Sequence, residues 1–432
     1  MVLPTSMESF PLASFGDEWE APMYKCSGRL IAGLLSCVVL VGAGCAPPAE
    51  QPPVPVSIAA GRAHTCVVMS DATVRCWGGN TSGELGDGTT VNRPSAVKVN
   101  GLSDVAQIAA GSGTTCAVRR DGTVWCWGSN SYHVLGGFSG AISSVPVQIT
   151  GIADAVSVSV SGNNGNAREF GQHGCVVRRT GGVSCWGGNA FGQLGNGTKT
   201  DSTVPVDVVG ISDATQVAAG GAFTCAVSRS GSIKCWGSGA WGKLGIDDGN
   251  DHSTPVEVIG VSGATDLSAG SFYSCAIADG GMAMCWGMAT FGQVGDGRNY
   301  SPFDPYRFVS PPKTVVGPVV TAGSGIAASP DPVYGTSAVG HSCAVRAGAS
   351  VACWGINLSG ELGVSSPSEV ASMPVEVSGV SGVTDVVTGG SHSCALMSAE
   401  VRCWGNNTFG QLGAGPGLPW GPNPTPLTVK GL

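Results

Sequence analysis

Fourteen of the seventeen cysteines form seven pairs with nearly constant spacing, and these are the residues whose chemistry is most evident in the sequence. The pairs are Cys66 with Cys76, Cys116 with Cys126, Cys175 with Cys185, Cys225 with Cys235, Cys275 with Cys285, Cys343 with Cys353, and Cys394 with Cys403. Cysteines that recur so regularly indicate disulfides in an oxidising compartment or ligands of a metal.

The segment Cys116 to Gly128, CAVRRDGTVWCWG, explains this spacing as a β-hairpin. Its centre falls on Asp121, which predicts a three-residue loop with Gly122 in the left-handed position that such a loop requires. Counting outward, Cys116 faces Cys126 at a non-hydrogen-bonded pair, where Cα atoms approach to about 4.5 Å and a disulfide forms easily. In the last pair the turn is one residue shorter and the register is the same. We therefore expect seven disulfides, each closing one hairpin.

Metal ligation is the alternative use of these cysteines. Structural zinc sites need C-x2-C pairs or histidine partners at fixed spacing, and the cysteine pairs here have neither. The sequence therefore favours disulfides, each contributing about 3 kcal/mol in the loop-entropy view, and we expect no metal and no cofactor.

The second cysteines of successive pairs lie 50, 59, 50, 50, 68 and 50 residues apart, which indicates a 50-residue repeat with two insertions. Each unit contains a PV-x-V segment, an IAAG-type segment, the cysteine hairpin and a G-x-L-G loop. Apolar segments with period two between glycine-rich turns predict four short antiparallel strands per unit. We predict an all-β fold: a seven-bladed β-propeller of four-stranded antiparallel blades.

The motif W-G-x-N-x-x-G-Q-L-G, present at 186–195 and 404–413, resembles the regulator of chromosome condensation repeat family. The resemblance covers residues 57–432 and implies a seven-bladed propeller. The chain enters mid-unit at VSIAAG and ends on PLTVKGL, the strand that the first unit lacks. We therefore expect the C-terminal strand to complete blade one and close the ring. The family's founding member acts on a small nuclear GTPase and contacts chromatin, while similar propellers include secreted inhibitors that clamp a protein with one rim.

Residues 23–45 have the layout of a secretory signal, with Lys25 and Arg29 followed by the apolar run LIAGLLSCVVLV and small residues. This run is too short for a comfortable membrane span. The acidic residues before it do not suit a signal, so we expect translation to start at Met23 and residues 1–22 to lie upstream of the true start.

The tripeptide before Cys45 resembles a bacterial lipoprotein cleavage box, which implies a lipid on Cys45. Its first residue is glycine where that class prefers leucine, and cleavage near Ala46 without a lipid is the alternative. Residues 46–56 are rich in proline and predict an extended linker. We expect an outer-membrane or cell-surface lipoprotein, otherwise a periplasmic or secreted protein.

Two features point to rims of the predicted ring as binding surfaces. Five units carry an aromatic residue in the G-Q-L-G-type loop, where the other two carry Ser82 and Ser359. The two insertions interrupt the same connection, before the first cysteine, on blades three and six. Aromatic rings offer large contact area at low entropic cost, although each could instead pack as core beneath its loop. The candidate binding residues are Tyr132, Phe191, Trp241, Phe291, Phe409, Arg168, Phe170 and Tyr334.

Candidate catalytic groups are sparse. Four histidines share the position two residues before a first cysteine, and we expect a hydrogen-bonding core role for His64, His173, His341 and His392. The acidic group Asp247, Asp248 and Asp251 lacks the spacing of a calcium loop and is expected to be solvated. The sequence contains no Ser/His/Asp set and no phosphate-binding loop, so we expect no enzymatic activity.

The functional expectation follows from these observations. A net charge of −8 leaves no basic surface for phosphates, so we expect no nucleic-acid partner. We expect an exported, lipid-anchored, monomeric propeller that serves as a protein- or glycan-binding scaffold at the cell envelope, contacting the membrane only through its lipid. An envelope enzyme with a site at the channel mouth, such as a lyase or hydrolase, and a purely structural surface protein are the alternatives.

Overall fold

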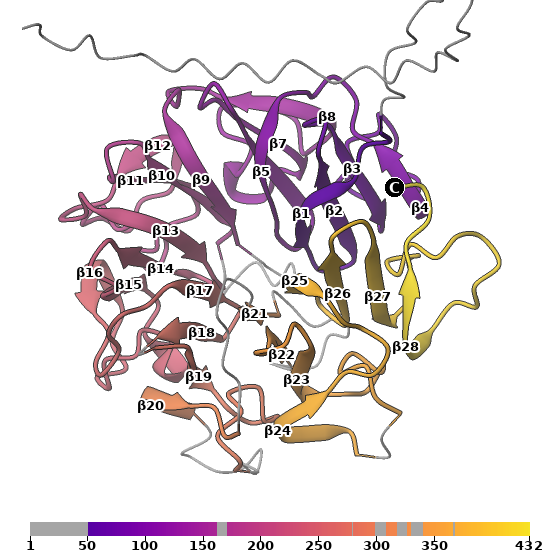
Figure 1. Cartoon of the computed structure of the whole chain (residues 1–432). Helices are drawn as coiled ribbons and strands as arrows, with labels where there is room; N and C mark the ends of the chain where they lie inside the picture. The colour runs from indigo at the N-terminus through magenta and orange to yellow at the C-terminus, as the bar shows by residue number, and fades with distance from the viewer. Residues whose placement is uncertain are drawn as a thin grey trace, which may run out of the picture. The chain divides into compact units, whose positions relative to one another are not determined.

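The computed structural model describes residues 51–161, 171–278, 280–298, 308–317, 326–329, 340–365 and 368–432. The chain divides into two units, Met1–Pro52 and Pro53–Leu432, and the second unit contains all the strands (Figure 1). Cys45 and the predicted signal segment lie outside the described residues. Among those described, the helices are two 3-10 turns, η1 (Ser131–His133) and η2 (Ala240–Gly242), and no helix is long and apolar enough to cross a membrane.

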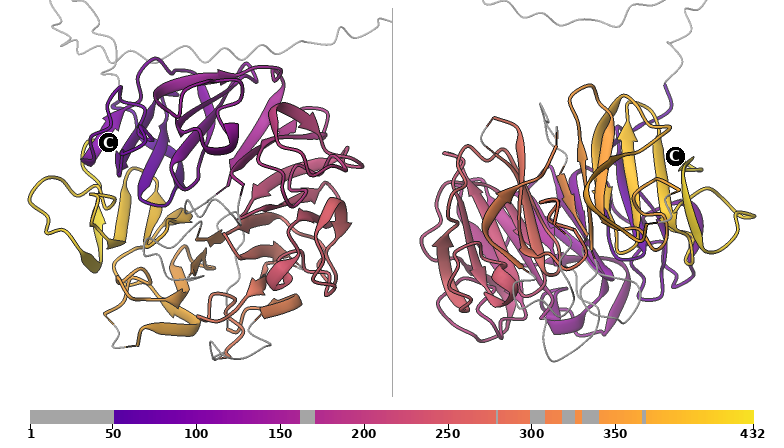
Figure 2. Two further views of the ribbon diagram at one scale, coloured as in Figure 1. Left: turned by 180° about the vertical axis from the view of Figure 1, so that it is seen from behind. Right: turned by 90° about the horizontal axis from the view of Figure 1, so that it is seen from below.

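The strands form seven four-stranded antiparallel sheets arranged as a ring, which confirms the predicted propeller (Figures 1 and 2). Each sheet contains four consecutive strands. Blades one to four consist of β1 (Pro55–Ala60), β2 (His64–Met69), β3 (Val74–Gly78), β4 (Arg93–Lys98); β5 (Val105–Ala110), β6 (Thr114–Arg119), β7 (Val124–Ser129), β8 (Ile142–Ile149); β9 (Ala155–Val160), β10 (His173–Arg178), β11 (Val183–Gly187), β12 (Ser202–Asp207); and β13 (Ala214–Ala219), β14 (Phe223–Ser228), β15 (Ile233–Gly237), β16 (His252–Glu257). Blades five to seven consist of β17 (Asp266–Ala269), β18 (Tyr273–Ala278), β19 (Met282–Met288), β20 (Phe308–Thr314); β21 (Ile326–Ala328), β22 (His341–Val345), β23 (Val351–Ile356), β24 (Val370–Glu376); and β25 (Val383–Thr388), β26 (His392–Met397), β27 (Val401–Asn406), β28 (Pro422–Thr428).

The position of a strand in its blade follows from its composition. The first strands contact one another around the ring and line its central channel, so small residues such as Ala59 and Ala218 suit them. The second and third strands carry the buried cysteines, valines and tryptophans that form the core. The fourth strands are the outermost strands of their sheets and carry proline, which lacks the N–H group needed to pair with another edge.

The cysteine hairpins have the predicted register. In blade two, Ala117 pairs with Trp125 and Val118 with Val124, so that the two cysteines of the hairpin face each other. All seven predicted disulfides are present, with Cα atoms 4.0–4.1 Å apart. They join Cys66 to Cys76, Cys116 to Cys126, Cys175 to Cys185, Cys225 to Cys235, Cys275 to Cys285, Cys343 to Cys353, and Cys394 to Cys403. The shorter turn of the last unit keeps its two cysteines opposite each other, as expected.

The expected closure by the C-terminal strand is wrong. β28 pairs with β27 in blade seven, and blade one has its own fourth strand, β4. The PV-x-V segment therefore ends its own blade rather than beginning the next one. A short connection of the type Val/Ile-x-Gly, such as VNGL at 99–102, leads from it to the first strand of the following blade, so no strand is missing from the first unit.

The seam between blades seven and one is joined by bonds that involve the C-terminus. The N–H of Ala96 in β4 donates to the carbonyl of Lys430 (2.9 Å), and the Arg75 guanidinium donates to the carbonyl of Gly431. Ala96 occupies a position where the other six blades carry proline, namely Pro146, Pro205, Pro255, Pro312, Pro374 and Pro426. The one fourth strand that meets the end of the chain thus has an N–H group at this position.

We predict that Ala349→Gly stabilises the propeller by about 0.5–1 kcal/mol. Ala349 is the equivalent of Gly122 in its hairpin and has φ of 60°, a left-handed conformation that costs an alanine more than a glycine. The control is Gly122→Ala, because Gly122 has φ of 83° and a Cβ there would lie 2.6 Å from the Ala153 carbonyl oxygen. The control should lose about 1–3 kcal/mol. Chemical denaturation of the oxidised protein measures both, and equal effects would contradict the assigned turn.

Candidate functional site

The aromatic candidates lie in the loops between the third and fourth strands, as Phe191 does between β11 and β12. Because adjacent strands of a blade are antiparallel, these loops share one end of the blades with the connections between first and second strands. Those connections contain the two insertions. We call this end the aromatic face and define it by Tyr132, Phe191, Trp241, Phe291 and Phe409.

All five aromatic side chains are half-buried. Each therefore packs partly on its blade and leaves part of its ring open to contact. Three further candidates from the insertions, Arg168, Phe170 and Tyr334, lie outside the described residues. The structure thus places five of the eight candidates at one repeat position on one face.

A buried glutamine fixes the loop beneath three of these aromatic residues. The backbone N–H of Phe191 donates to Oε1 of Gln193 (3.0 Å), and Phe291 and Phe409 are bound in the same way by Gln293 and Gln411 (2.8 Å each). The glutamines are at most 1% exposed. Where the aromatic residue is replaced by Ser82 or Ser359, the glutamine is replaced by Glu84 or Glu361, whose carboxylates accept the serine N–H at 2.6 Å.

The same loop position also joins neighbouring blades. The indole Nε1–H of each tryptophan that follows a second cysteine donates to the backbone carbonyl of this residue in the preceding blade, at 2.8–3.0 Å. All seven tryptophans are fully buried and belong to the core. The acceptors are Gln411, Glu84, Val134, Gln193, Lys243, Gln293 and Glu361.

Blade four places a lysine at this position. Lys243 is 1% exposed, and its ammonium group donates to the Gly221 carbonyl at 3.2 Å. The same Nζ lies 5.6 Å from the ring centre of Phe223 and 6.0 Å from that of Phe272. A buried cation needs such partners, and the two phenylalanine rings stabilise the ammonium group by cation–π interactions. Lys243 follows Trp241 by two residues in the sequence.

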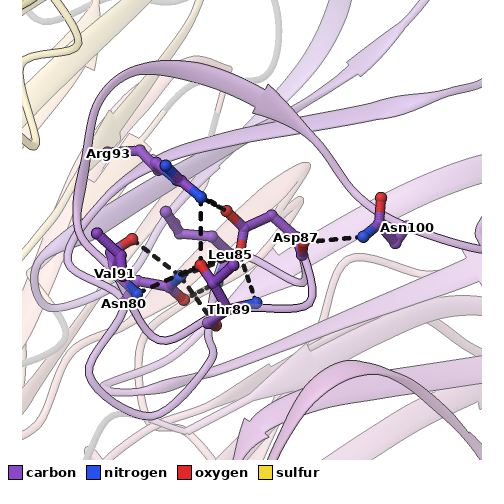
Figure 3. A network of polar contacts seen from close by, with 7 residues as sticks. All are labelled: Asn80, Leu85, Asp87, Thr89, Val91, Arg93 and Asn100. Carbon is purple, nitrogen blue, oxygen red and sulfur yellow. Dashed lines mark hydrogen bonds and ion pairs between the residues drawn. The ribbon is translucent and has the colours of Figure 1, made fainter.

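An asparagine that the sequence analysis did not single out holds the loop of blade one together (Figure 3). Asn80 is fully buried, and its Nδ2 donates to Asp87 Oδ1 (3.2 Å) and to the carbonyls of Thr89 and Val91 (3.1 Å each). Its Oδ1 accepts the N–H of Leu85 at 2.9 Å. Asn189 makes equivalent bonds in blade three. The available signal was the recurring asparagine of the W-G-x-N motif.

The four histidines have the expected hydrogen-bonding role. Each is fully buried, and its Nε2 lies 2.8–2.9 Å from a serine or threonine hydroxyl of the next blade. Within the described residues, no group of three or more His, Cys, Asp or Glu could hold a metal ion.

The acidic loop of blade four is bound by protein groups. Asp248 lies 2.8 Å from Nε2 of His252, and Asp251 lies 3.4 Å from the Lys199 ammonium group. These partners, together with the backbone N–H of Asn250 and Gly239, occupy the carboxylates that a calcium ion would need.

The central channel is a cavity of about 300 Å³. Its polar side chains satisfy the edges of the first strands: Gln107 binds both the N–H and the C=O of Val158, and Asp266 accepts the N–H of Ile326 at 3.1 Å. Burial, together with the nearby charge of Asp266, raises the pKa of Asp385 to about 7. The channel is therefore lined in part by polar side chains, and those of Gln107 and Asp266 are hydrogen-bonded to the backbone of the adjacent first strand.

Comparison with known proteins agrees with this architecture. The model of the RCC1-like domain matches residues 49–329, and that of the regulator of chromosome condensation (RCC1) repeat matches residues 383–411. No curated protein matches the chain by sequence. The structure of human WBSCR16 superposes with a TM-score of 0.66 at 21% identity, covering 81% of this chain and 88% of that chain. Prp20p from Saccharomyces cerevisiae gives a TM-score of 0.68 at 19% identity, covering 88% of each chain.

The fold and its repeat define a disulfide-bonded β-propeller with a face of half-buried aromatic residues. The chain belongs to the RCC1-like domain family.

We predict that Asn80→Ala destabilises the propeller by about 2–4 kcal/mol, because it leaves the buried N–H of Leu85 without its acceptor and removes the donor to the part-buried carbonyls of Thr89 and Val91. Asn100→Ala is the matched control: this side chain makes a single exposed bond to the Asp87 carbonyl, and its loss should cost less than about 1 kcal/mol. Denaturation followed by tryptophan fluorescence compares the two variants. Similar losses would show that Asn80 does not organise the loop.

Proposed function

We propose that the chain is an exported binding and scaffold module of the cell envelope, anchored by a lipid on Cys45, and that the aromatic face contacts a protein partner. The observation that carries this proposal is the recurrence of five half-buried aromatic side chains at one position of one face. Aromatic residues on a rigid support dominate protein interfaces, because their contact costs little side-chain entropy.

The seven disulfides support an oxidising environment. The layout of residues 23–45 supports export, and the sequence before Cys45 supports a lipid anchor. The low charge density of the chain, with 12% charged residues, suits contacts through aromatic area rather than through a strong electrostatic field.

Relatives support a protein partner. The structure of Prp20p is described together with its binding to Gsp1p and histones, which are proteins. The net charge of −8 of this chain argues against a nucleic-acid partner, because the chain offers no positive field to phosphates. Gsp1p and histones are not assigned to this chain, since a common fold does not carry a common ligand. The partner is therefore proposed by its class alone.

The aromatic face can be tested with substitutions that the chain itself contains. The triple variant Phe191→Ser, Trp241→Ser, Phe291→Ser introduces serine in three blades. Serine is the residue that two other blades already carry at this position, as Ser82 and Ser359. We expect this variant to fold and to bind the envelope protein captured by the unmodified propeller with an affinity at least about tenfold lower.

The matched control is Val209→Ser with Ile259→Ser. These side chains are 53% and 51% exposed and follow the fourth strands, at the opposite end of the blades. The control should keep the partner, which is identified by cross-linking and mass spectrometry and then titrated as a purified protein. Loss with both variants, or with the control alone, would contradict the assignment to the aromatic face, and capture of glycan only would contradict a protein partner.

Export and anchoring are tested separately by the intact mass of the protein made in a bacterial host with a lipoprotein pathway. We expect a mature chain that begins at Cys45, carries an acyl adduct and gains mass on reduction and alkylation of fourteen cysteines. A Cys45→Ser variant should be released from membranes. Retention of residues 1–45 with free thiols would overturn export, whatever the aromatic variants show.

A further inference from the structure

No disulfide joins one blade to another in the part of the chain that the structure describes. Every described disulfide closes one hairpin, across nine or ten residues, within one blade. The cohesion of the ring therefore depends on contacts between blades. These include the tryptophan bonds and four histidine bonds, and only the histidines can change charge in mildly acidic solution.

The histidine bonds fix which ring nitrogen carries the proton. Nε2 of His64 lies 2.9 Å from Oγ1 of Thr115, and that hydroxyl donates its own hydrogen to the Glu84 carbonyl at 2.8 Å. The hydroxyl must therefore accept from Nε2–H, which leaves Nδ1 without a proton. The same reasoning holds for the hydroxyls that His173 and His341 meet, Thr224 and Ser393, which donate to carbonyls at 2.9 Å.

Nδ1 has no partner in any of the four histidines, although the atom is buried. The ring lies directly against a glycine of the AAG-type connection. A Cβ on Gly61 would lie 2.4 Å from Cε1 and 2.8 Å from Nδ1 of His64, and one on Gly389 would lie 2.1 and 2.3 Å from the same atoms of His392. A proton added to Nδ1 of His64 or His392 would therefore have no hydrogen-bond acceptor, and the buried positive charge would be strongly destabilising.

Three of these histidine bonds occur at consecutive interfaces. His341 bonds blade six to seven, His392 bonds seven to one through Thr65 (2.8 Å), and His64 bonds one to two. The middle interface is the seam where the two ends of the propeller meet. The fourth, His173, joins blades three and four on the other side of the ring.

Two other interfaces provide an internal comparison that does not depend on histidine. Phe223 takes the position in blade four, against Gly220 and opposite blade five. Tyr273 takes it in blade five and donates to the His341 carbonyl at 2.6 Å. These side chains do not gain a positive charge in acid.

The charged and titratable groups around the seam do not offset a protonated histidine. His392 is flanked by His64 and His341, which lower its pKa further after burial. The other ionisable groups on the packed elements include Arg62, Arg75, Glu84, Glu361, Asp385, Arg402 and the phenol of Tyr273. Burial raises the pKa of Glu361 to about 7 and raises that of Glu84, so both lose their negative charge as the solution becomes acidic.

We propose that the histidine bonds make the seam an acid-sensitive joint: protonation of His341, His392 and His64 opens the ring between blades seven and one while the disulfide-closed blades stay folded. This inference is independent of the proposed binding function. It assigns the opening to the one interface that no continuous chain crosses.

The direction of the pH dependence follows from linkage. Burial lowers the pKa of His64 and His173 to about 4 and of His341 and His392 to about 3. The unfolded or opened state binds more protons, so the stabilisation is complete above about pH 6.5 and is lost as the pH falls toward these values. Glu361 and Asp385, whose pKa values are raised, act in the opposite sense and weaken the fold as the pH rises toward about 7.

Hydrogen exchange of the oxidised full chain at about pH 7 and about pH 4.5, corrected for intrinsic rates, tests the proposal. We expect peptides 61–69 and 389–397 to lose protection at the lower pH by at least about tenfold more than peptides 220–228 and 270–278. Uniform loss, or earlier loss at the phenylalanine interface, would overturn it.

Variants separate the histidines from other causes. His64→Phe with His392→Phe copies Phe223, and we expect its seam to open at a pH lower by about one unit than the unmodified seam. His173→Phe should not shift the seam. Ala96→Pro removes the donor to the Lys430 carbonyl without touching a histidine, and should raise the opening pH. If the double variant opens at the same pH as the unmodified chain, protonation of the histidines does not cause the opening. If the double variant does not fold, the pH shift of Ala96→Pro and the exchange pattern of the unmodified chain still test whether the ring opens at the seam.

Discussion

The indole N–H of each blade's tryptophan donates to a backbone carbonyl of the preceding blade, and this bond recurs at all seven interfaces of the ring. The tryptophan directly follows the second cysteine, so the hairpin that the disulfide closes also fixes the direction of the indole. The carbonyl that receives it belongs to the residue that holds the aromatic loop from below, as Gln193 does for Phe191. One position of the repeat therefore sets the spacing of the blades and the support of the aromatic face together.

Covalent bonds stabilise each blade internally, and non-covalent contacts hold neighbouring blades together. Disulfides restrict the unfolded hairpins and keep each blade's register, but their stabilisation does not extend across an interface. Between blades, the tryptophan bond, the histidine or its aromatic substitute, and the short connection that follows each fourth strand all hold neighbouring blades together. Such a ring resembles other repeat proteins, in which the stability of a unit and the stability of its interfaces are separate quantities.

Much of the fold could be predicted from the sequence because its strongest signals are local. The position of Gly122 and the symmetry of the Cys116 hairpin define the register within thirteen residues. The closing strand was predicted wrongly because a PV-x-V segment has turns on both sides, and local pattern does not show whether it ends one blade or begins the next. The partners of Asn80 and of the histidines could not be predicted, because the Asn80 bonds depend on how its own loop folds and the histidines bond to hydroxyls of a neighbouring blade. For the aromatic face, the sequence identified the shared position, and the structure added its half-buried state.

Blades one and six carry a serine and a glutamate in this loop, where blades three, five and seven carry a phenylalanine and a glutamine. Gln193 and Gln411 accept a backbone N–H through Oε1 and donate through Nε2, to the Gly171 carbonyl and to Asn406 Oδ1. A carboxylate can accept but cannot donate, and burying it without a donor of its own is costly. Burial raises the pKa of Glu361 to about 7, so near neutral pH a large share of Glu361 is a carboxylic acid, which has the shape and the donor of glutamine. In both serine loops the carboxyl group accepts the serine N–H as the glutamine amide oxygen accepts the phenylalanine N–H, and because burial raises the pKa of Glu84 and of Glu361, their ionisation costs folding free energy as the pH rises.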